Sequence, residues 1–188
     1  MSAVEKLFQE HRLIERVVSA LEACANSVQG DSEQSRSDLL RFVTFFREFA
    51  DLMHHEKEEE FLMPALVEAG LNWEEGLMLQ IRKEHDFERH LLQTLRHLAL
   101  QFGAWSADDC RRVIDISERF VKFMRNHIAL EDGKLHQLIG ERLTADAQAK
   151  LEVKLHQFDA KREVSGEMSL LLNLGEQLAT RHAPRALP

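Results

Sequence analysis

Apolar residues at helical spacing, interrupted by only a few glycine-containing breaks, are the feature that most constrains the fold of this chain. The chain contains 8 Gly and 3 Pro, and Leu, Glu, Ala, Arg and Gln dominate it while alternating β-branched residues are missing. Breaks fall at residues 29–32, 69–72, 103–106 and 140–144, where Gly can end a helix and Asp, Asn, Ser or Thr can cap the next. The sequence therefore predicts an all-α fold with long helices over residues 3–29, 33–69, 73–102 and 107–140.

The short connections predict how these helices are arranged. Neighbouring helices joined by short loops pack antiparallel, so an up-down-up-down four-helix bundle over residues 1–143 is expected. Residues 144–188 form a C-terminal helical extension, with one further helix to about residue 181 and a break near Ser165-Gly166. The sequence leaves open whether this extension packs on its own bundle or, in a homodimer, on a partner chain.

Charge and composition exclude several classes of partner. The formal net charge is −8 and no block of Lys and Arg occurs, which argues against a nucleic-acid or membrane partner because phosphate groups are bound by clustered cations. No apolar run of signal-peptide or membrane-spanning type is seen, so a cytoplasmic protein is expected. Cys24 and Cys110 lie far apart without a Cys-x-x-Cys motif and are read as two reduced thiols.

A His-x-x-x-Glu repeat marks three of the four predicted bundle helices. The motif occurs at His11, His54 and His127, and the remaining helix carries His85. Residues four apart lie about 40° from each other around a helix axis, so both members of a pair can reach one point. Counted from the loops, the four histidines lie at nearly the same depth, within about one turn. The repeat therefore predicts that the histidines meet in the bundle core.

Such a convergence points to metal. Buried ionisable groups without partners are costly, whereas imidazoles and carboxylates that ligate a divalent cation are satisfied. Glu58 and Glu131 can each bridge two ions, so the pattern predicts a dinuclear site with the four histidines as terminal ligands. A bundle with a polar but metal-free core is the alternative.

The motifs also carry a resemblance. The stretch HHEKEEEFLMPAL resembles the bacterial hemerythrin-like HHE family, and EHRLIERVVSAL, EHDFERHLLQTL and NHIALEDGKLHQL resemble its first, third and fourth helices. This resemblance implies a non-haem centre of two iron ions. The ligands that it implies are His11, His54, Glu58, His85, His127 and Glu131. Imidazole and carboxylate also suit manganese and zinc, so iron depends on the resemblance.

The chain departs from the family pattern on the third helix. Oxygen-carrying hemerythrins have a second histidine there at His-x-x-x-His spacing, but Ile81 and Arg89 stand four residues before and after His85. His55 is the expected substitute, reaching the rim of the site, because in an ideal α-helix it is rotated by about 100° from His54. Glu15 and Glu88 are weaker candidates for the seventh ligand, and both are expected to face solvent. The remaining acidic neighbours are expected to form a solvated face: Glu56, Glu59 and Glu60. The histidines at 90, 97, 136, 156 and 182 are read as surface or packing residues.

Two classes of function fit these residues. One is a binding module that binds, senses or scavenges a small ligand such as dioxygen, peroxide or nitric oxide. The alternative is an enzyme with peroxidase-like or iron-centre repair activity at the same site. Ferritin-like di-iron oxidases use Glu-x-x-His pairs, which do not occur here, and the chain contains no Tyr, which excludes a tyrosyl radical. Whether the protein is an enzyme is not decided by the sequence.

Overall fold

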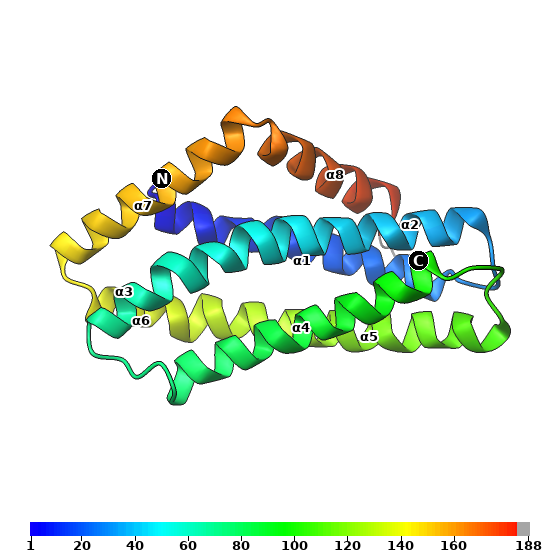
Figure 1. Cartoon of the computed structure of the whole chain (residues 1–188), viewed down its shortest axis with the longest axis horizontal. Helices are drawn as coiled ribbons and strands as arrows, with labels where there is room; N and C mark the ends of the chain where they lie inside the picture. The colour runs from blue at the N-terminus through cyan, green and yellow to red at the C-terminus, as the bar shows by residue number, and fades with distance from the viewer. Residues whose placement is uncertain (184–188) are drawn as a thin grey trace, which may run out of the picture.

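A computed structural model of the chain describes residues 1–183, and every regular element in this range is helical (Figure 1). Four helical columns form the bundle. The first and third are single helices, α1 (Ala3–Asn26) and α4 (Gly76–Leu100). The second joins α2 (Glu33–Phe45), the π-helices η1 (Phe46–His55) and η2 (Glu58–Leu62), and α3 (Met63–Glu68). The fourth joins α5 (Ala107–Leu130), the π-helix η3 (Glu131–Leu135) and α6 (His136–Arg142). The predicted all-α bundle is confirmed.

Helix ends fall where the sequence places capping residues. Ser2 and Ser106 each accept a hydrogen bond from the backbone three residues on, and Glu5 and Asp109 accept one in return, which completes two capping boxes. Ser32 caps α2 in the simpler way. These caps satisfy amide groups that would otherwise lack partners at the start of each column.

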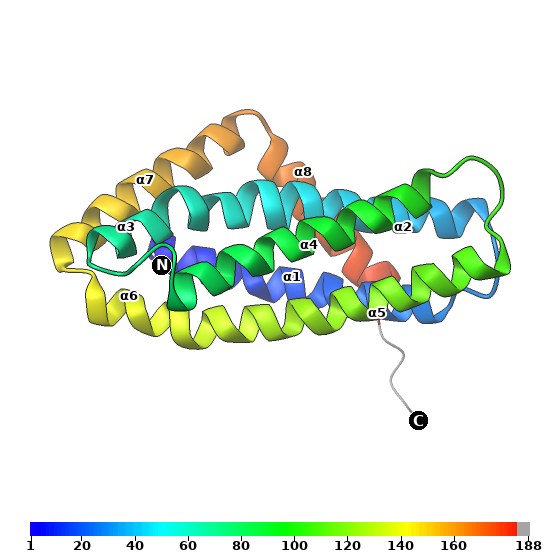
Figure 2. The same cartoon turned by 60° about the horizontal axis from the view of Figure 1, so that its bottom comes forward.

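The C-terminal extension is a bent arm made of α7 (Ala145–Val164) and α8 (Glu167–Arg181), which lies on the bundle of its own chain (Figure 2). The break falls at Ser165–Gly166 as expected, and Gly166 adopts a φ of 75°, which a residue without a Cβ tolerates. α7 packs against α1 and η2, and α8 packs against α1 and α2. The arm therefore covers one side of the first two columns.

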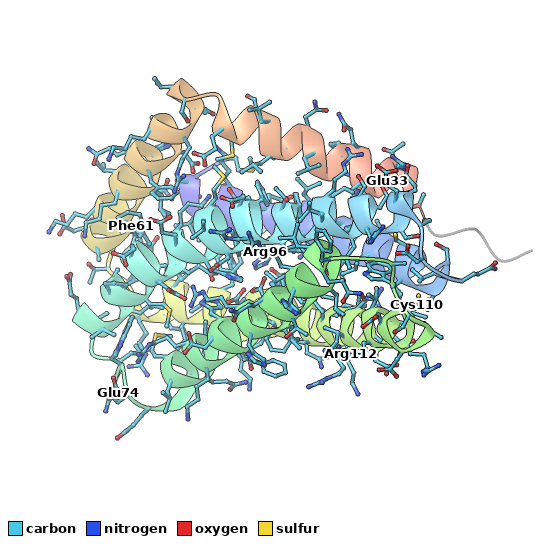
Figure 3. The ribbon with its side chains drawn as sticks, turned by 45° about the vertical axis from the view of Figure 1, so that its right-hand side comes forward. Glu33, Phe61, Glu74, Arg96, Cys110 and Arg112 are labelled. Atoms are coloured by element: carbon cyan, nitrogen blue, oxygen red, sulfur yellow. The ribbon has the colours of Figure 1, made fainter. Side chains whose placement is uncertain are left out.

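Two apolar clusters fill the bundle. The larger joins α1, α2, η1, α4 and α5 with α8, and the smaller joins the start of α1 and of α4 with α3, α6 and α7. Between these two clusters along each column lie buried His and Glu side chains, which together form a polar layer across the bundle. Charged side chains such as Glu74 and Arg112 lie on the periphery (Figure 3). Within the described range no helix is long and apolar enough to cross a membrane. Cys24 and Cys110 form no disulfide.

Candidate metal centre

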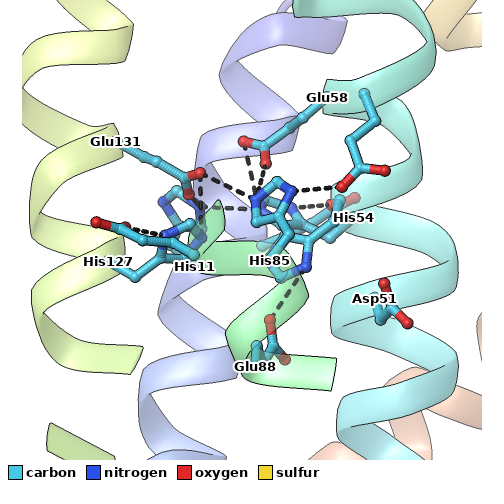
Figure 4. A network of polar contacts seen from close by, with 12 residues as sticks. His11, Asp51, His54, Glu58, His85, Glu88, His127 and Glu131 are labelled. Atoms are coloured by element: carbon cyan, nitrogen blue, oxygen red, sulfur yellow. Dashed lines mark hydrogen bonds and ion pairs between the residues drawn. The ribbon is translucent and has the colours of Figure 1, made fainter. Parts of the chain in front are cut away.

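Seven side chains with metal-ligating atoms meet in the polar layer as two adjoining groups (Figure 4). In each group the candidate ligand atoms all lie within 4.8 Å of one another. All seven residues are at most 1% exposed. The first group is His11, His54, Glu58 and Glu131, and the second is His55, His85 and His127. The structure thus brings together every side chain that the sequence singled out as a ligand, and the columns supply them from all four sides of the core.

The two glutamates lie between the groups. Glu58 directs Oε1 toward His54 Nε2 at 3.7 Å and Oε2 toward His85 Nε2 at 3.4 Å. Glu131 directs Oε2 toward His11 Nε2 at 3.3 Å, while its Oε1 lies 3.1 Å from His127 Nε2. Each carboxylate therefore presents one oxygen to each group, which is the arrangement that a pair of bridging carboxylates requires.

The histidines present their Nε2 atoms to the centre because a carboxylate lies at each Nδ1. The partners are Asp132 for His11 at 2.6 Å, Glu10 for His54 at 3.0 Å, Glu88 for His55 at 3.2 Å, Glu59 for His85 at 2.6 Å and Glu84 for His127 at 2.8 Å. A carboxylate at Nδ1 keeps the proton on that nitrogen, orients the ring and makes Nε2 a stronger ligand. Hydrogen bonds at Nδ1 thus orient four of the imidazoles so that Nε2 can ligate a cation, whereas His55 Nδ1 lies near Glu88 without a hydrogen bond.

The helical geometry explains why His54 and His55 both face inward. In an α-helix, adjacent residues point about 100° apart, which is why His55 was expected at the rim. η1 ends at His55 and η2 begins at Glu58, so this column is wound as a π-helix where it passes the site. Wider turns of this kind are frequent at functional sites. His55 is consequently 1% exposed and stacks on His85 with ring centroids 3.9 Å apart.

Two of the acidic residues expected in solvent are placed differently by the structure. Glu88 is fully buried and faces His55, because it lies one turn below His85 on the inner face of α4. Glu59 is partly buried and accepts hydrogen bonds from His85 Nδ1 and from Arg89. Glu60 is exposed as expected, whereas Glu15 and Glu56 are partly exposed. Sequence spacing missed Glu88 and Glu59 because it followed one helix at a time.

Other residues around the site were also missed. Glu10, Glu84 and Asp132 reach their histidines from a different column, and Lys57 is buried at 2% exposure beside Glu10. The signal that could have found Glu10, Glu84 and Asp132 is their position immediately before or after a ligand in the sequence, at residues 11, 85 and 131. Of the histidines read as surface or packing residues, His136 packs its ring on Phe8.

The charges at the centre show what the site favours. Burial raises the pKa of Glu131, but His127, His11 and His85 lower it well below its ordinary value. Burial lowers the pKa of His85, but Glu131, Glu58 and Glu59 raise it well above its ordinary value. The carboxylates thus attract positive charge into a space that excludes water. A divalent cation bound there would supply that charge in place of protons on Nε2.

The second group has a different balance. Burial lowers the pKa of His55, and the neighbouring positive charges of His85 and His127 lower it further, well below the ordinary value. Burial raises the pKa of Glu88 to about 8. His55 is therefore a neutral imidazole, which is the form in which histidine binds metal.

Unpaired buried atoms test whether a metal fits these residues. Within residues 1–183, both oxygens of Glu58 and of Glu131 lack a hydrogen-bond partner, as do Nε2 of His85 and of His127. His11 Nε2 and His54 Nε2 lie 2.9 Å apart. If both nitrogens are unprotonated, their lone pairs repel each other unless a cation lies between them. Buried polar atoms in proteins almost always have partners. Nitrogen and oxygen donors aimed at shared points fit divalent metal ions.

Comparison with known proteins agrees with this geometry. A family model described as the hemerythrin HHE cation binding domain matches residues 2–139, which is most of the chain and includes all seven candidate ligands. A search of curated proteins and a search of solved structures found no significant match. The match ends before α7, so the bent arm lies outside it. The chain belongs to the hemerythrin HHE cation-binding family.

Proposed function

We propose that this protein holds two iron ions in the polar layer and uses them to bind or sense a small ligand such as dioxygen, peroxide or nitric oxide. The observation that supports this most strongly is the division of Glu58 and Glu131 between two groups of histidines. Iron at such a site supplies reversible redox chemistry and affinity for small diatomic ligands. Manganese and zinc accept the same donor atoms, so metal identity is part of the proposal.

The donor atoms are divided unequally, and this supports a ligand-binding role. The first group offers the Nε2 atoms of His11 and His54 with two carboxylate oxygens, whereas the second adds a third imidazole to its carboxylate oxygens. A metal position with fewer protein donors is the one that keeps room for an external ligand. We therefore place small-ligand binding beside His11 and His54.

The surroundings of the site support binding over turnover. The two apolar clusters on either side exclude water from the layer, which protects a bound small ligand from proton transfer. Glu88 is a buried acid beside the second group, but it lies at Nδ1 of His55, on the side of the ring away from Nε2. It is therefore poorly placed to give a proton to a ligand at the centre. Peroxidase-like activity remains the alternative.

The test is metal analysis joined to optical spectroscopy. Protein loaded anaerobically with Fe²⁺ is expected to bind about two ions per chain, as a pair of bridging carboxylates implies. Exposure to air, nitric oxide or peroxide should then change the absorption spectrum, and removal of dioxygen or nitric oxide should reverse the change. A stoichiometry near one or zero after loading overturns the dinuclear site. Sustained consumption of peroxide would favour the enzyme instead.

A further inference from the structure

A continuous series of buried charges joins the bent arm to a candidate metal ligand. Asp159 of α7 is 6% exposed and lies 3.3 Å from Nζ of Lys57, which is itself buried. Lys57 also donates to Glu10 Oε1, and Glu10 Oε2 lies 3.0 Å from Nδ1 of His54. Lys6 approaches Asp159 from the other side at 2.7 Å. Positive and negative groups therefore alternate from the edge of the molecule to the first group of ligands.

The position of Lys57 depends on both carboxylates. A buried ammonium group is costly unless its donors are satisfied, and breaking one of its pairs leaves an uncompensated charge. Here Glu10 lies on α1 and Asp159 lies on α7, so the arm supplies one of the two carboxylates. If Asp159 were neutral, Lys57 would have Glu10 as its one charged partner. The carboxylate of Glu10 would then be drawn toward Lys57 through Oε1, which would turn Oε2 away from its position 3.0 Å from His54 Nδ1.

We propose that Asp159 is a positioning residue of the metal centre. By holding Lys57 from the other side, it keeps the Glu10 carboxylate where Oε1 meets Lys57 and Oε2 meets His54 Nδ1, so that His54 stays oriented and strongly basic at Nε2. The bent arm lies outside the region matched by the family, and through Asp159 it contributes to the orientation of a metal ligand. This inference depends on the proposed metal binding, because His54 must be a ligand for its orientation to matter.

The experiment compares Asp159→Asn with a matched control on the same helix. Glu152 also sits on α7 and ties it to α1, by accepting hydrogen bonds from the backbone of Ala3 and Val4, but it has no contact with Lys57 or Glu10. Glu152→Gln therefore removes one charge and weakens one contact between α7 and α1, and it leaves the contacts of Asp159, Lys57 and Glu10 unchanged. Affinity for Fe²⁺ is measured anaerobically in competition with a coloured chelator. Loss of a carboxylate partner of a ligand costs about 10- to 100-fold in affinity, so Glu10→Gln should fall in that range.

Asp159 acts one step further out, and Asp159→Asn should weaken the binding of one ion about 3- to 10-fold while Glu152→Gln does not. Because Asp159 acts through the charge of Lys57, adding Asp159→Asn to Lys57→Met should cause no further loss of affinity. A spectroscopic readout separates this role from a merely structural one. In Zn²⁺-loaded protein with ¹⁵N-labelled histidine, the ring signals of His54 should move in Asp159→Asn, and those of His127 should not.

A second variant covers the case in which Asp159→Asn does not fold. Lys6 is partly exposed, and Lys6→Gln releases Asp159 to hold Lys57 more closely. The His54 ring signals should therefore move in this variant too. Unchanged signals in Lys6→Gln, or equal affinities in Asp159→Asn and Glu152→Gln, overturn the proposal while leaving the metal site intact. If the parent protein binds no metal, the proposed function itself is overturned.

Discussion

Single carboxylates decide which histidines can act as ligands in this protein. Each of the five buried rings has a carboxylate at Nδ1, and that partner comes from a different part of the chain than the ring in every case. Ring orientation is therefore a property of the folded bundle rather than of any one helix. Substitutions at the centre and at its partners should have separable effects.

His55 provides the first test at this scale. His55→Ala removes one of three imidazoles from the second group and leaves the four donors of the first group in place. We expect metal content after Fe²⁺ loading to fall from about two ions per chain to about one, since fewer donors remain for one of two ions. Elemental analysis measures this. His90→Ala, at an exposed position of α4, is the control. Two retained ions in His55→Ala would place His55 outside the ligand set.

Glu59 and Glu60 form a matched pair of adjacent glutamates. Glu59 accepts hydrogen bonds from His85 Nδ1 at 2.6 Å and from Arg89 at 2.8 Å, whereas Glu60 is exposed. Glu59→Gln should weaken Fe²⁺ binding by about 10- to 100-fold, because His85 loses its charged partner. Glu60→Gln should bind as the parent does. Equal affinities of the two variants in chelator competition would contradict a role for Glu59.

At the scale of helices, periodicity and breaks were enough to predict the four columns. The expected range 3–29 corresponds to Ala3–Asn26, and 73–102 corresponds to Gly76–Leu100. This succeeded because apolar spacing and capping residues are local properties of the sequence. The region around residues 46–62 was harder, since its π-helical turns differ from the 3.6-residue repeat on which the spacing argument rests.

The candidate ligands were predictable because they lie on one helix face at matched depth. Their partners were not, since Glu10, Glu84 and Asp132 meet their histidines across columns. The inward position of His55 depends on the π-helical register, and burial of Glu88 depends on a neighbouring column. Such relations arise from packing between elements, which spacing along one element does not contain.

Docking of α8 can be tested by its glycine. A Cβ built on Gly175 would lie 2.6 Å from Cε2 of Phe45, a ring that is itself buried and stacked on Phe49. Gly175→Ala should therefore lower the free energy of unfolding by about 1–3 kcal/mol, as overpacking does in other cores. Urea denaturation measures the change.

Gly140→Ala is the control for that substitution. Gly140 lies in α6 with nothing within 4 Å of a built Cβ, so alanine should stabilise the helix by about 0.5–1 kcal/mol. Opposite signs for the two variants are expected. If Gly175→Ala also stabilised the protein, the close approach of α8 to α2 would be wrong.

At the scale of the whole molecule, the polar layer separates two apolar clusters, and each cluster includes one helix of the bent arm. The arm therefore spans the layer from one side, and Asp159 reaches inward from it. The clusters should keep the metal-free protein folded, because they bury most of the apolar side chains. The free energy of unfolding of the metal-free protein should then depend on pH through the ionisable groups of the polar layer.

Those charges predict how the metal-free protein responds to pH. Burial lowers the pKa of His11, but Asp132 and Glu131 raise it to about 10, and burial raises the pKa of Glu88 to about 8. Both folded-state values lie above those of an unfolded chain, so the stabilisation is complete at low pH and is lost as pH rises through them. The free energy of unfolding of the metal-free protein should therefore fall between pH 7 and pH 10.

Urea denaturation at pH 7, 8.5 and 10 measures this slope in metal-free protein and in protein loaded with Zn²⁺. Metal takes the place of the protons on the ligand nitrogens, so the loaded protein should lose less stability over the same range. His11→Gln should make the metal-free slope shallower, because the residue with the highest of these pKa values is gone. A metal-free protein whose stability stays constant or increases toward pH 10 would show that His11 does not hold its proton between the two carboxylates.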